Sequence, residues 1–185
     1  MTARTSRGSR AKWIPMAVTA LAVVASAIVA FPGSASAALP TLNVERRIQN
    51  FYGQCLVSRT SATVGDAASD TTCNTQYADE RWVFYQDSTD PDYVHLRSVD
   101  QTTVQGTSIC LYDNAVGHLA ELTPCVHTSN QEWFVHYRRT DGYFIMQNKS
   151  TGRYLKAEGN TPWAVVDTQP VAGVHSEEWH QIATS

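Results

Sequence analysis

The sequence predicts an all-β domain built from three repeats of about 47 residues each. First, a tryptophan recurs with an acidic or amide residue two positions before it, at Trp82, Trp133 and Trp179, which lie 51 and 46 residues apart. Second, a strand, a turn and a further strand recur, and the further strand opens on Cys or Tyr followed by Leu. Third, no convincing amphipathic helix follows Ala38. One such unit cannot bury its own apolar face, whereas three units closed around an axis share a core, where we expect the three tryptophans.

The first 37 residues have the three parts of a secretory signal. A basic segment is followed by an Ala- and Val-rich apolar segment and then by small residues. We expect cleavage after Ala37, which leaves a mature domain of residues 38–185. The alternative is an uncleaved membrane anchor, but the helix breakers Pro32 and Gly33 favour cleavage. No later segment is apolar for long enough to span a bilayer, so we expect the mature chain to be secreted and extracellular, without a membrane span.

The strands of each repeat follow from residues that alternate between apolar and polar. Alternation with a period of two is clear in Tyr93–Arg97 and in Trp133–Tyr137 and is typical of strands with one buried face. Turn residues such as Asp141-Gly142 separate the strands. The repeats span about residues 44–86, 93–137 and 143–183, with strand–turn–strand segments at 47–56, 94–111 and 144–155, the second of which carries an insertion.

Charge excludes two classes of partner. Residues 1–37 carry four basic side chains and no acidic one, so the rest of the chain has ten basic and seventeen acidic side chains, a net charge of −7. Phosphate binding needs clustered Lys and Arg, so we expect no nucleic-acid partner and no anionic membrane surface.

The four cysteines indicate two disulfides, because an even number in an exported chain is typical of a disulfide framework. The count alone leaves three connectivities open. The chain has no Cys-x-x-Cys motif and no His at ligand spacing to a Cys, so we expect no metal site and no cofactor.

In the second repeat, Ile109-Cys110-Leu111 is followed by Pro124-Cys125 and by Asn130-Gln131-Glu132-Trp133-Phe134. This pattern is similar to that of the ricin-type β-trefoil, the Gln-x-Trp lectin family. The first and third repeats have Glu in place of Gln, and the third has Tyr154 in place of the first Cys. The resemblance covers nearly all of the mature chain. It implies a β-trefoil of three repeats around a pseudo-threefold axis.

The resemblance also implies which cysteines pair. In this family a disulfide commonly closes each repeat, from the first Leu-bearing strand to the Cys before Gln-x-Trp. The implied pairs are Cys55 with Cys73 and Cys110 with Cys125.

A sugar site in this family has an Asp two positions after the first Cys and an aromatic residue two positions before the second Cys. An Asn before Gln-x-Trp completes it. The first repeat has Val57 and Thr71 at the first two positions, and the third has Lys156 at the Asp position. We expect neither repeat to bind sugar in the family's way.

The second repeat retains part of this sugar site. Tyr112 stands at the Asp position, Asp113 comes one residue later, and Asn130 and Gln131 are both present. A one-residue bulge would turn the Asp113 carboxylate into the pocket and leave Tyr112 as the stacking ring. We therefore expect a carbohydrate site of Asp113, Asn130, Gln131 and Tyr112. In the alternative interpretation, Asp113-Asn114 is a turn that Asn130 caps.

The expected function is that of a secreted, lectin-like protein that binds an extracellular glycan or polysaccharide without catalysis. The sequence has no Gly-x-Ser-x-Gly or His-Glu-x-x-His motif, so we expect no catalytic residues. The alternative is a protein-binding trefoil module, such as a toxin-associated subunit or an inhibitor of an extracellular hydrolase. The eroded sugar positions favour this alternative. An exposed aromatic patch would indicate a protein partner, and a polar pocket under Asp113 would indicate a sugar.

Overall fold

The computed structural model describes residues 40–59, 63–86, 88–116, 119–137, 141–158, 166–170 and 172–184. The signal peptide predicted at residues 1–37, with its cleavage position, lies outside the described residues. In the described ranges, no helix is long and apolar enough to cross a membrane.

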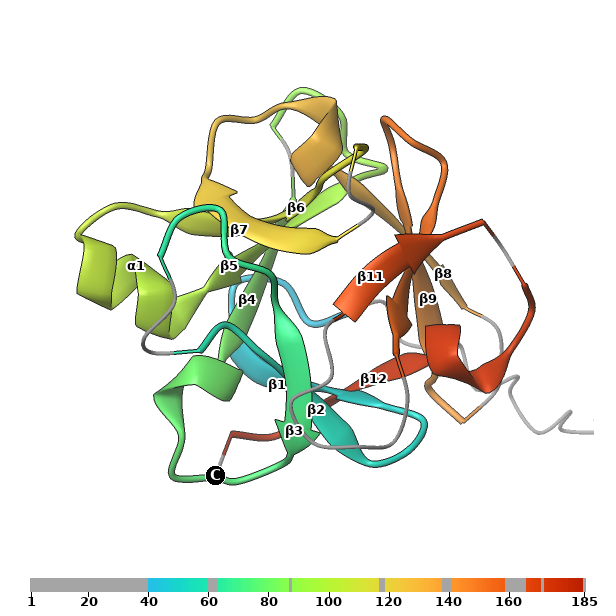
Figure 1. The fold of residues 1–185 in the computed structure, drawn as a ribbon, viewed down its shortest axis with the longest axis horizontal. Coiled ribbons are helices and arrows are strands. Elements are labelled where there is room, and N and C mark those ends of the chain that lie inside the picture. The colour runs from blue at the N-terminus through green and yellow to red at the C-terminus, as the bar shows by residue number, and fades with distance from the viewer. Residues whose placement is uncertain are drawn as a thin grey trace, which may run out of the picture. The chain divides into compact units, whose positions relative to one another are not determined.

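In the residues that the structure describes, each of the three repeats forms four strands (Figure 1). A 3-10 turn precedes the last strand of each repeat: η1 (Ala78–Glu80), η2 (Ser129–Gln131) and η3 (His175–Glu177). The strands are β1 (Glu45–Asn50), β2 (Gln54–Val57), β3 (Ser69–Thr72), β4 (Trp82–Gln86), β5 (Val94–Ser98), β6 (Ile109–Asp113), β7 (Ala120–Pro124), β8 (Trp133–Tyr137), β9 (Phe144–Asn148), β10 (Tyr154–Ala157), β11 (Val166–Gln169) and β12 (Trp179–Ile182).

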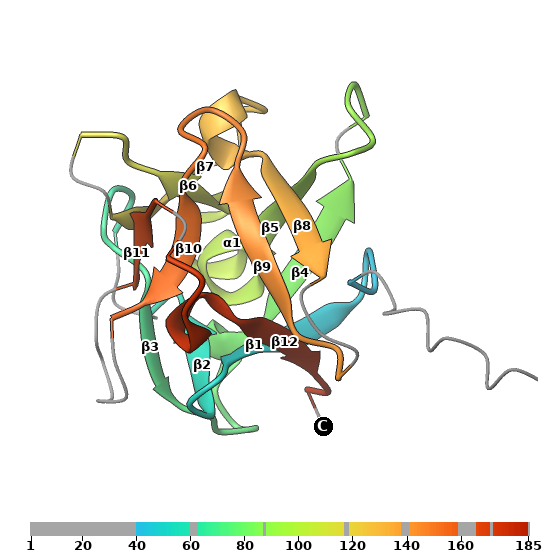
Figure 2. The same ribbon diagram turned by 90° about the vertical axis from the view of Figure 1, so that its right-hand side faces the viewer.

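Six of the described strands, all of which are labelled in Figure 2, close into a barrel. The antiparallel pairings run from β1 to β4, β5, β8, β9 and β12, and from β12 back to β1. Each repeat gives its first and last strands to this ring. Closure leaves the barrel strands without an open sheet edge.

The two middle strands of each repeat form a hairpin: β2 with β3, β6 with β7, and β10 with β11. The three hairpins lie in different sectors of the view in Figure 1. Backbone bonds join them, because Ala68 N donates to Ala120 O at 2.7 Å and Val166 N donates to Ala68 O at 3.0 Å. One residue from each hairpin thus takes part in a junction that links all three repeats.

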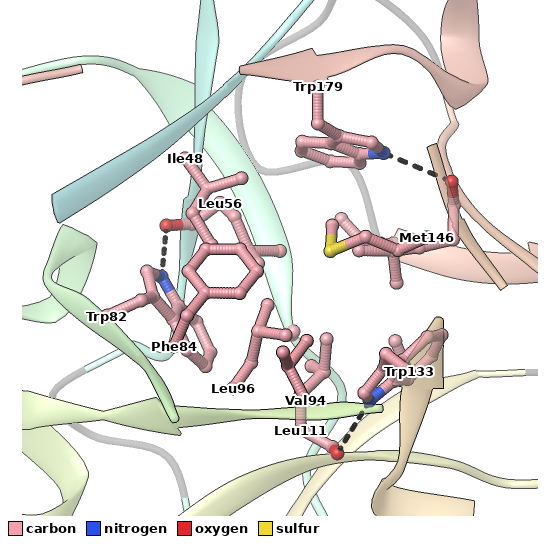
Figure 3. Close-up of a cluster of buried hydrophobic side chains, with 14 of the residues drawn as sticks. Ile48, Leu56, Trp82, Phe84, Val94, Leu96, Leu111, Trp133, Met146 and Trp179 are labelled. Carbon is pink, nitrogen blue, oxygen red and sulfur yellow. Dashed lines mark hydrogen bonds between the residues drawn. The ribbon is translucent and has the colours of Figure 1, made fainter. Parts of the chain in front are cut away.

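The three tryptophans lie at equivalent positions in one core and are fully buried (Figure 3). Each indole Nε1 donates to the carbonyl of the Leu in its own repeat's second strand. The distances are 2.8 Å from Trp82 to Leu56, 3.3 Å from Trp133 to Leu111 and 3.1 Å from Trp179 to Leu155. The recurring Trp and Leu therefore tie each repeat's last strand to its hairpin.

Two disulfides form, between Cys55 and Cys73 and between Cys110 and Cys125. These are the pairs that the family resemblance implies. In the third repeat, Arg153 holds the hairpin instead, because its guanidinium Nε donates to Thr168 O at 2.9 Å.

One element departs from the expectation of no helix. The insertion in the second repeat forms α1 (Val99–Gln105), which the Ser98 hydroxyl caps by accepting from Gln101 N at 3.1 Å. Gly106 ends it in the left-handed region at φ 69°. Gln101 is the only buried residue of α1. A seven-residue helix without an apolar stripe leaves no hydrophobic periodicity in the sequence, which is why the sequence did not predict it.

Candidate functional site

The Gln or Glu of each Gln-x-Trp-like motif is fully buried and holds the loop before it. Gln131 Oε1 accepts from Val126 N at 2.8 Å, and its Nε2 donates to Pro124 O and to Thr123 Oγ1, both at 2.7 Å. Gln131, predicted to contact sugar, therefore has its amide occupied within the protein.

In the other two repeats, the equivalent carboxylates also accept hydrogen bonds from the loop that precedes them. Both oxygens of Glu80 accept from Asn74 N, at 2.8 and 2.9 Å. Glu177 accepts from two donors, Ala172 N at 2.8 Å and Gly173 N at 3.2 Å. Burial raises the pKa of Glu80 to about 7, against the lowering effects of the Asn74 hydrogen bond and of the Arg47 charge.

Asp113 is fully buried at the joint between the second and third repeats. Its Oδ1 accepts from Thr168 Oγ1 at 2.8 Å, and its Oδ2 accepts from Thr151 Oγ1. Both threonines belong to the third repeat. The carboxylate is thus engaged by two hydroxyls of the protein itself.

The bulge that would turn Asp113 outward is not present. The register of β6 with β7 runs unbroken from Ile109 opposite Pro124 to Asp113 opposite Ala120. Strand alternation therefore keeps Asp113 inside and leaves its neighbour Tyr112 half-buried.

Asp113 is the last residue of β6, and a turn follows it. Asn114 N donates to Leu119 O at 2.9 Å, and Asn130 Nδ2 donates to Asp113 O at 3.0 Å. This is the arrangement of the alternative interpretation, in which Asn130 caps the turn. The structure brings Asp113 and Asn130 together, as expected, but as a buried joint rather than as an open pocket.

A separate hollow of about 340 Å³ opens on the barrel where β8 and β9 meet, at the boundary of the second and third repeats. Tyr93 and Phe134 form an edge-on pair with ring centres 5.8 Å apart, and His136 packs against Phe134 at 4.3 Å. The lining residues are Tyr93, Phe134, His136, Gln147, Asn148, Lys149 and Gly152.

The polar side of the hollow is held in place by its own hydrogen bonds. Gln147 Nε2 donates to Gly152 O at 3.0 Å, so its Oε1 faces His136 Nε2, 3.1 Å away. That oxygen can only accept, so this hydrogen bond needs the imidazole tautomer with its N–H at Nε2. The amide and the imidazole are therefore fixed in orientation before any ligand arrives.

Lys149 lies at one side of the hollow between two carboxylates. Its Nζ is 2.8 Å from Asp90 Oδ2, forms an ion pair with Glu132, and lies 4.4 Å from the centre of the Tyr93 ring. Hydrogen bonds to Asp90 and Glu132 hold the pKa of Lys149 above its usual range. The ammonium is thus charged and positioned by three groups.

The pseudo-threefold relation explains why the hollow lies at this boundary. Lys149, Phe51 and Val99 occupy equivalent places, because their backbone N–H groups donate to Glu132 O, Glu178 O and Arg81 O. At the boundary of the third and first repeats, the Phe51 ring stacks on His175 at 4.0 Å and meets Tyr143 at 5.8 Å. At the boundary of the first and second repeats, Val99 begins α1.

Sequence reasoning missed this hollow. Its walls come from three separated segments, near Tyr93, at 134–136 and at 147–152, which no single motif joins. The aligned repeats do contain a signal, because the equivalent Asn50 and Asn148 are followed by different residues, Phe51 in the first repeat and Lys149 in the third.

A carboxyl pair lies in the third repeat. Burial and a hydrogen bond to Glu158 raise the pKa of Asp167 to about 6, and the same hydrogen bond lowers the pKa of Glu158. Lys156 Nζ lies 3.3 Å from Glu158. In the described residues, no group of three or more His, Cys, Asp and Glu side chains is placed to hold a metal ion.

Comparison with known proteins shows the fold. The designed threefold-symmetric protein ThreeFoil superposes with a TM-score of 0.62 at 16% identity, over 75% of this chain and 98% of its own. The fold is a β-trefoil. The trefoil is also similar to SeviL bound to asialo-GM1 saccharide, with a TM-score of 0.58 at 19% identity, over 76% of this chain and 98% of that one.

A third similar structure is a mosquitocidal holotoxin, with a TM-score of 0.64 at 14% identity. The match covers 76% of this chain but only 17% of the holotoxin, so the trefoil spans a small part of that protein. No family model matches the sequence, and no curated relative matches it.

Proposed function

We propose that this trefoil is a secreted, lectin-like protein that binds an extracellular glycan without chemical turnover, through the hollow lined by Tyr93 and Phe134. The observation that carries the proposal is the combination of two aromatic rings with fixed polar groups in one small concave site. Small-molecule sites are typically concave, mostly apolar and supplied with a few placed polar groups.

The chemistry of the hollow suits a sugar ring. Aromatic faces pack against the C–H groups of a pyranose, and a fixed amide, imidazole and ammonium exchange hydrogen bonds with its hydroxyls. A volume of about 340 Å³ is at the small end of ligand sites. We therefore expect recognition of one sugar residue at the end of a glycan, with weak affinity for a single site and useful avidity only on multivalent surfaces.

Secretion and the absence of catalysis are parts of the same proposal. Two disulfides are typical of an oxidising, extracellular compartment. The adjacent carboxylates Glu177 and Glu178 are each committed, Glu177 to the loop before it and Glu178 to His175 at 2.9 Å, which supports a structural role for them.

One observation favours a second candidate, a protein-binding module. At the boundary of the third and first repeats, Phe51 contacts Tyr52, Tyr143 and His175, and the Tyr52 side chain is 47% exposed. Exposed aromatic side chains are enriched at protein interfaces. This candidate predicts that Tyr52→Ala weakens capture of the partner.

The experiment is a glycan array probed with the wild type and two variants. Tyr93→Ala removes the ring from the hollow. We expect its affinity for every glycan that the wild type binds to fall at least tenfold. Tyr77→Ala removes an exposed tyrosine elsewhere and is expected to bind as the wild type does. Glycan binding that survives Tyr93→Ala would disprove the site, and silence of the folded wild type across the array would favour the protein partner.

A further inference from the structure

A second hollow, of about 220 Å³, lies beside the one lined by Tyr93. Phe134 lines both hollows. Tyr93 lines the first, and its two neighbours in the chain, Asp92 and Val94, line the second. The two hollows therefore share a wall, which consists of Phe134 and the residues that lead into β5.

The walls of the second hollow are mostly apolar. Apart from Phe134, they include two prolines, a leucine and two valines: Pro40, Pro91, Leu42, Val94 and Val135. Of the two polar residues among the described lining residues, Gln86 has its amide engaged, because its Nε2 donates to Pro91 O at 2.5 Å. The other, Asp92, is exposed to solvent. A ligand group in this hollow thus meets chiefly carbon atoms.

The apolar walls are held in place by the barrel. Leu42 lies in a parallel bridge with Phe84 of β4, and the next residue, Asn43, donates its backbone N–H to Phe84 O at 2.7 Å. Leu42 and Val135 both pack against the hydrophobic core. The second hollow is therefore formed by residues that the fold already positions, which lowers the entropic cost of binding.

The size of the hollow sets the size of the group that fits it. An apolar protein cavity of about 150 Å³ is large enough to hold benzene, so about 220 Å³ is room for one aromatic ring or a short alkyl chain. An apolar group that leaves water for such a hollow gains free energy. The hydroxyls of a second sugar would lose hydrogen bonds there.

We infer that the two hollows form one extended site, and that its best ligand is a sugar joined directly to an apolar aglycone of about one ring. The sugar would occupy the hollow lined by Tyr93, and the aglycone would occupy the second hollow on the other side of Phe134. This inference rests on the proposed function and adds the ligand class.

The test compares methyl, phenyl and hexyl β-glycosides of galactose, glucose, mannose and N-acetylglucosamine by NMR titration of the wild type. For each sugar that binds, we expect the phenyl glycoside to bind at least tenfold more tightly than the methyl glycoside. The hexyl glycoside shows whether an alkyl chain gives the same gain as a ring. Equal affinities of the methyl, phenyl and hexyl forms would overturn the inference while the glycan-binding function stood.

Two variants locate the aglycone, and a third is their control. Leu42→Asn makes one wall polar at nearly constant size, and we expect it to reduce the phenyl-to-methyl ratio below threefold without changing the affinity for the methyl glycoside. Pro91→Ala changes an exposed part of the same wall and should give a smaller reduction even where Leu42→Asn folds poorly. Val44→Asn makes the same kind of change as Leu42→Asn at an exposed valine, and it should keep the wild-type ratio.

The remaining outcomes separate the inference from the proposed function. A ratio unchanged by both Leu42→Asn and Pro91→Ala would overturn the place assigned to the aglycone. Failure of every phenyl glycoside to bind would overturn the inference as well. Silence of the folded wild type on the glycan array would overturn the proposed function itself.

Discussion

Asp113 illustrates how one position in a strand decides between a ligand site and a structural joint. A carboxylate at position 112 would face outward from β6, but at position 113 it faces inward. There the carboxylate accepts from Thr151 and Thr168 and so fastens the third repeat to the second. Asp113, which the sequence predicts as a sugar-binding residue, is therefore best explained as a hydrogen-bond acceptor that joins two repeats.

This role predicts a loss of stability on mutation. Asp113→Ala removes a buried acceptor shared by the buried hydroxyl of Thr168 and the half-buried hydroxyl of Thr151. We therefore expect the free energy of unfolding to fall by about 2–4 kcal/mol in urea denaturation. Asp92→Ala changes an exposed carboxylate and should stay within about 0.5 kcal/mol of the wild type. Unchanged stability of Asp113→Ala, together with a lost glycan signal, would instead restore Asp113 as a ligand residue.

At the scale of the element, the three 3-10 turns do one task with different side chains. Each places its final residue, Glu80, Gln131 or Glu177, under the loop that precedes the turn. Glu177 meets two backbone N–H groups, whereas Glu80 meets one. Burial outweighs the single N–H donor and the charge of Arg47, whose Nη1 lies 3.9 Å from Glu80, and this agrees with the raised pKa of Glu80, about 7.

The pH dependence of Glu80→Gln tests this difference. The pKa of Glu80 is about 7 in the folded protein and 4.5 for an unperturbed glutamate, so its contribution to stability is present below pH 4.5 and is lost as the pH rises through 7. We expect Glu80→Gln to gain stability relative to the wild type over this window, by on the order of 2 kcal/mol, and to reach a plateau above it. Thermal or urea unfolding at pH 4.5 to 8 measures the difference, in which other titrating groups cancel.

Glu177→Gln is the matched control for that variant. Its new amide N–H₂ would face a backbone N–H, either from Ala172 or from Gly173, so we expect destabilisation at every pH. A gain of stability in Glu177→Gln, or no pH-dependent gain in Glu80→Gln, would contradict the account of the turns.

At the scale of the whole molecule, the fold was predictable because its determinants recur along the sequence. Trp82, Trp133 and Trp179 each donate to a Leu carbonyl in their own repeat, so residues that recur at similar spacing in the sequence occupy equivalent positions in space. The site was not predictable in the same way. The hollow depends on Lys149 standing where Phe51 stands at another boundary, and its walls come from distant segments that only the closed barrel brings together. The family pattern predicted Asp113 as a sugar-binding residue. Residue spacing alone does not show which face of a strand a side chain is on, so the pattern could not show that Asp113 faces inward.

The central claim is that this trefoil recognises a sugar in the hollow between its second and third repeats. A ¹⁵N NMR titration of the purified protein with the glycan that binds best on the array tests it most directly. The account predicts saturable shifts centred on Tyr93, Phe134, His136 and Lys149. Shifts centred on Tyr112 and Asn114, or on Phe51 and Tyr52, would contradict it.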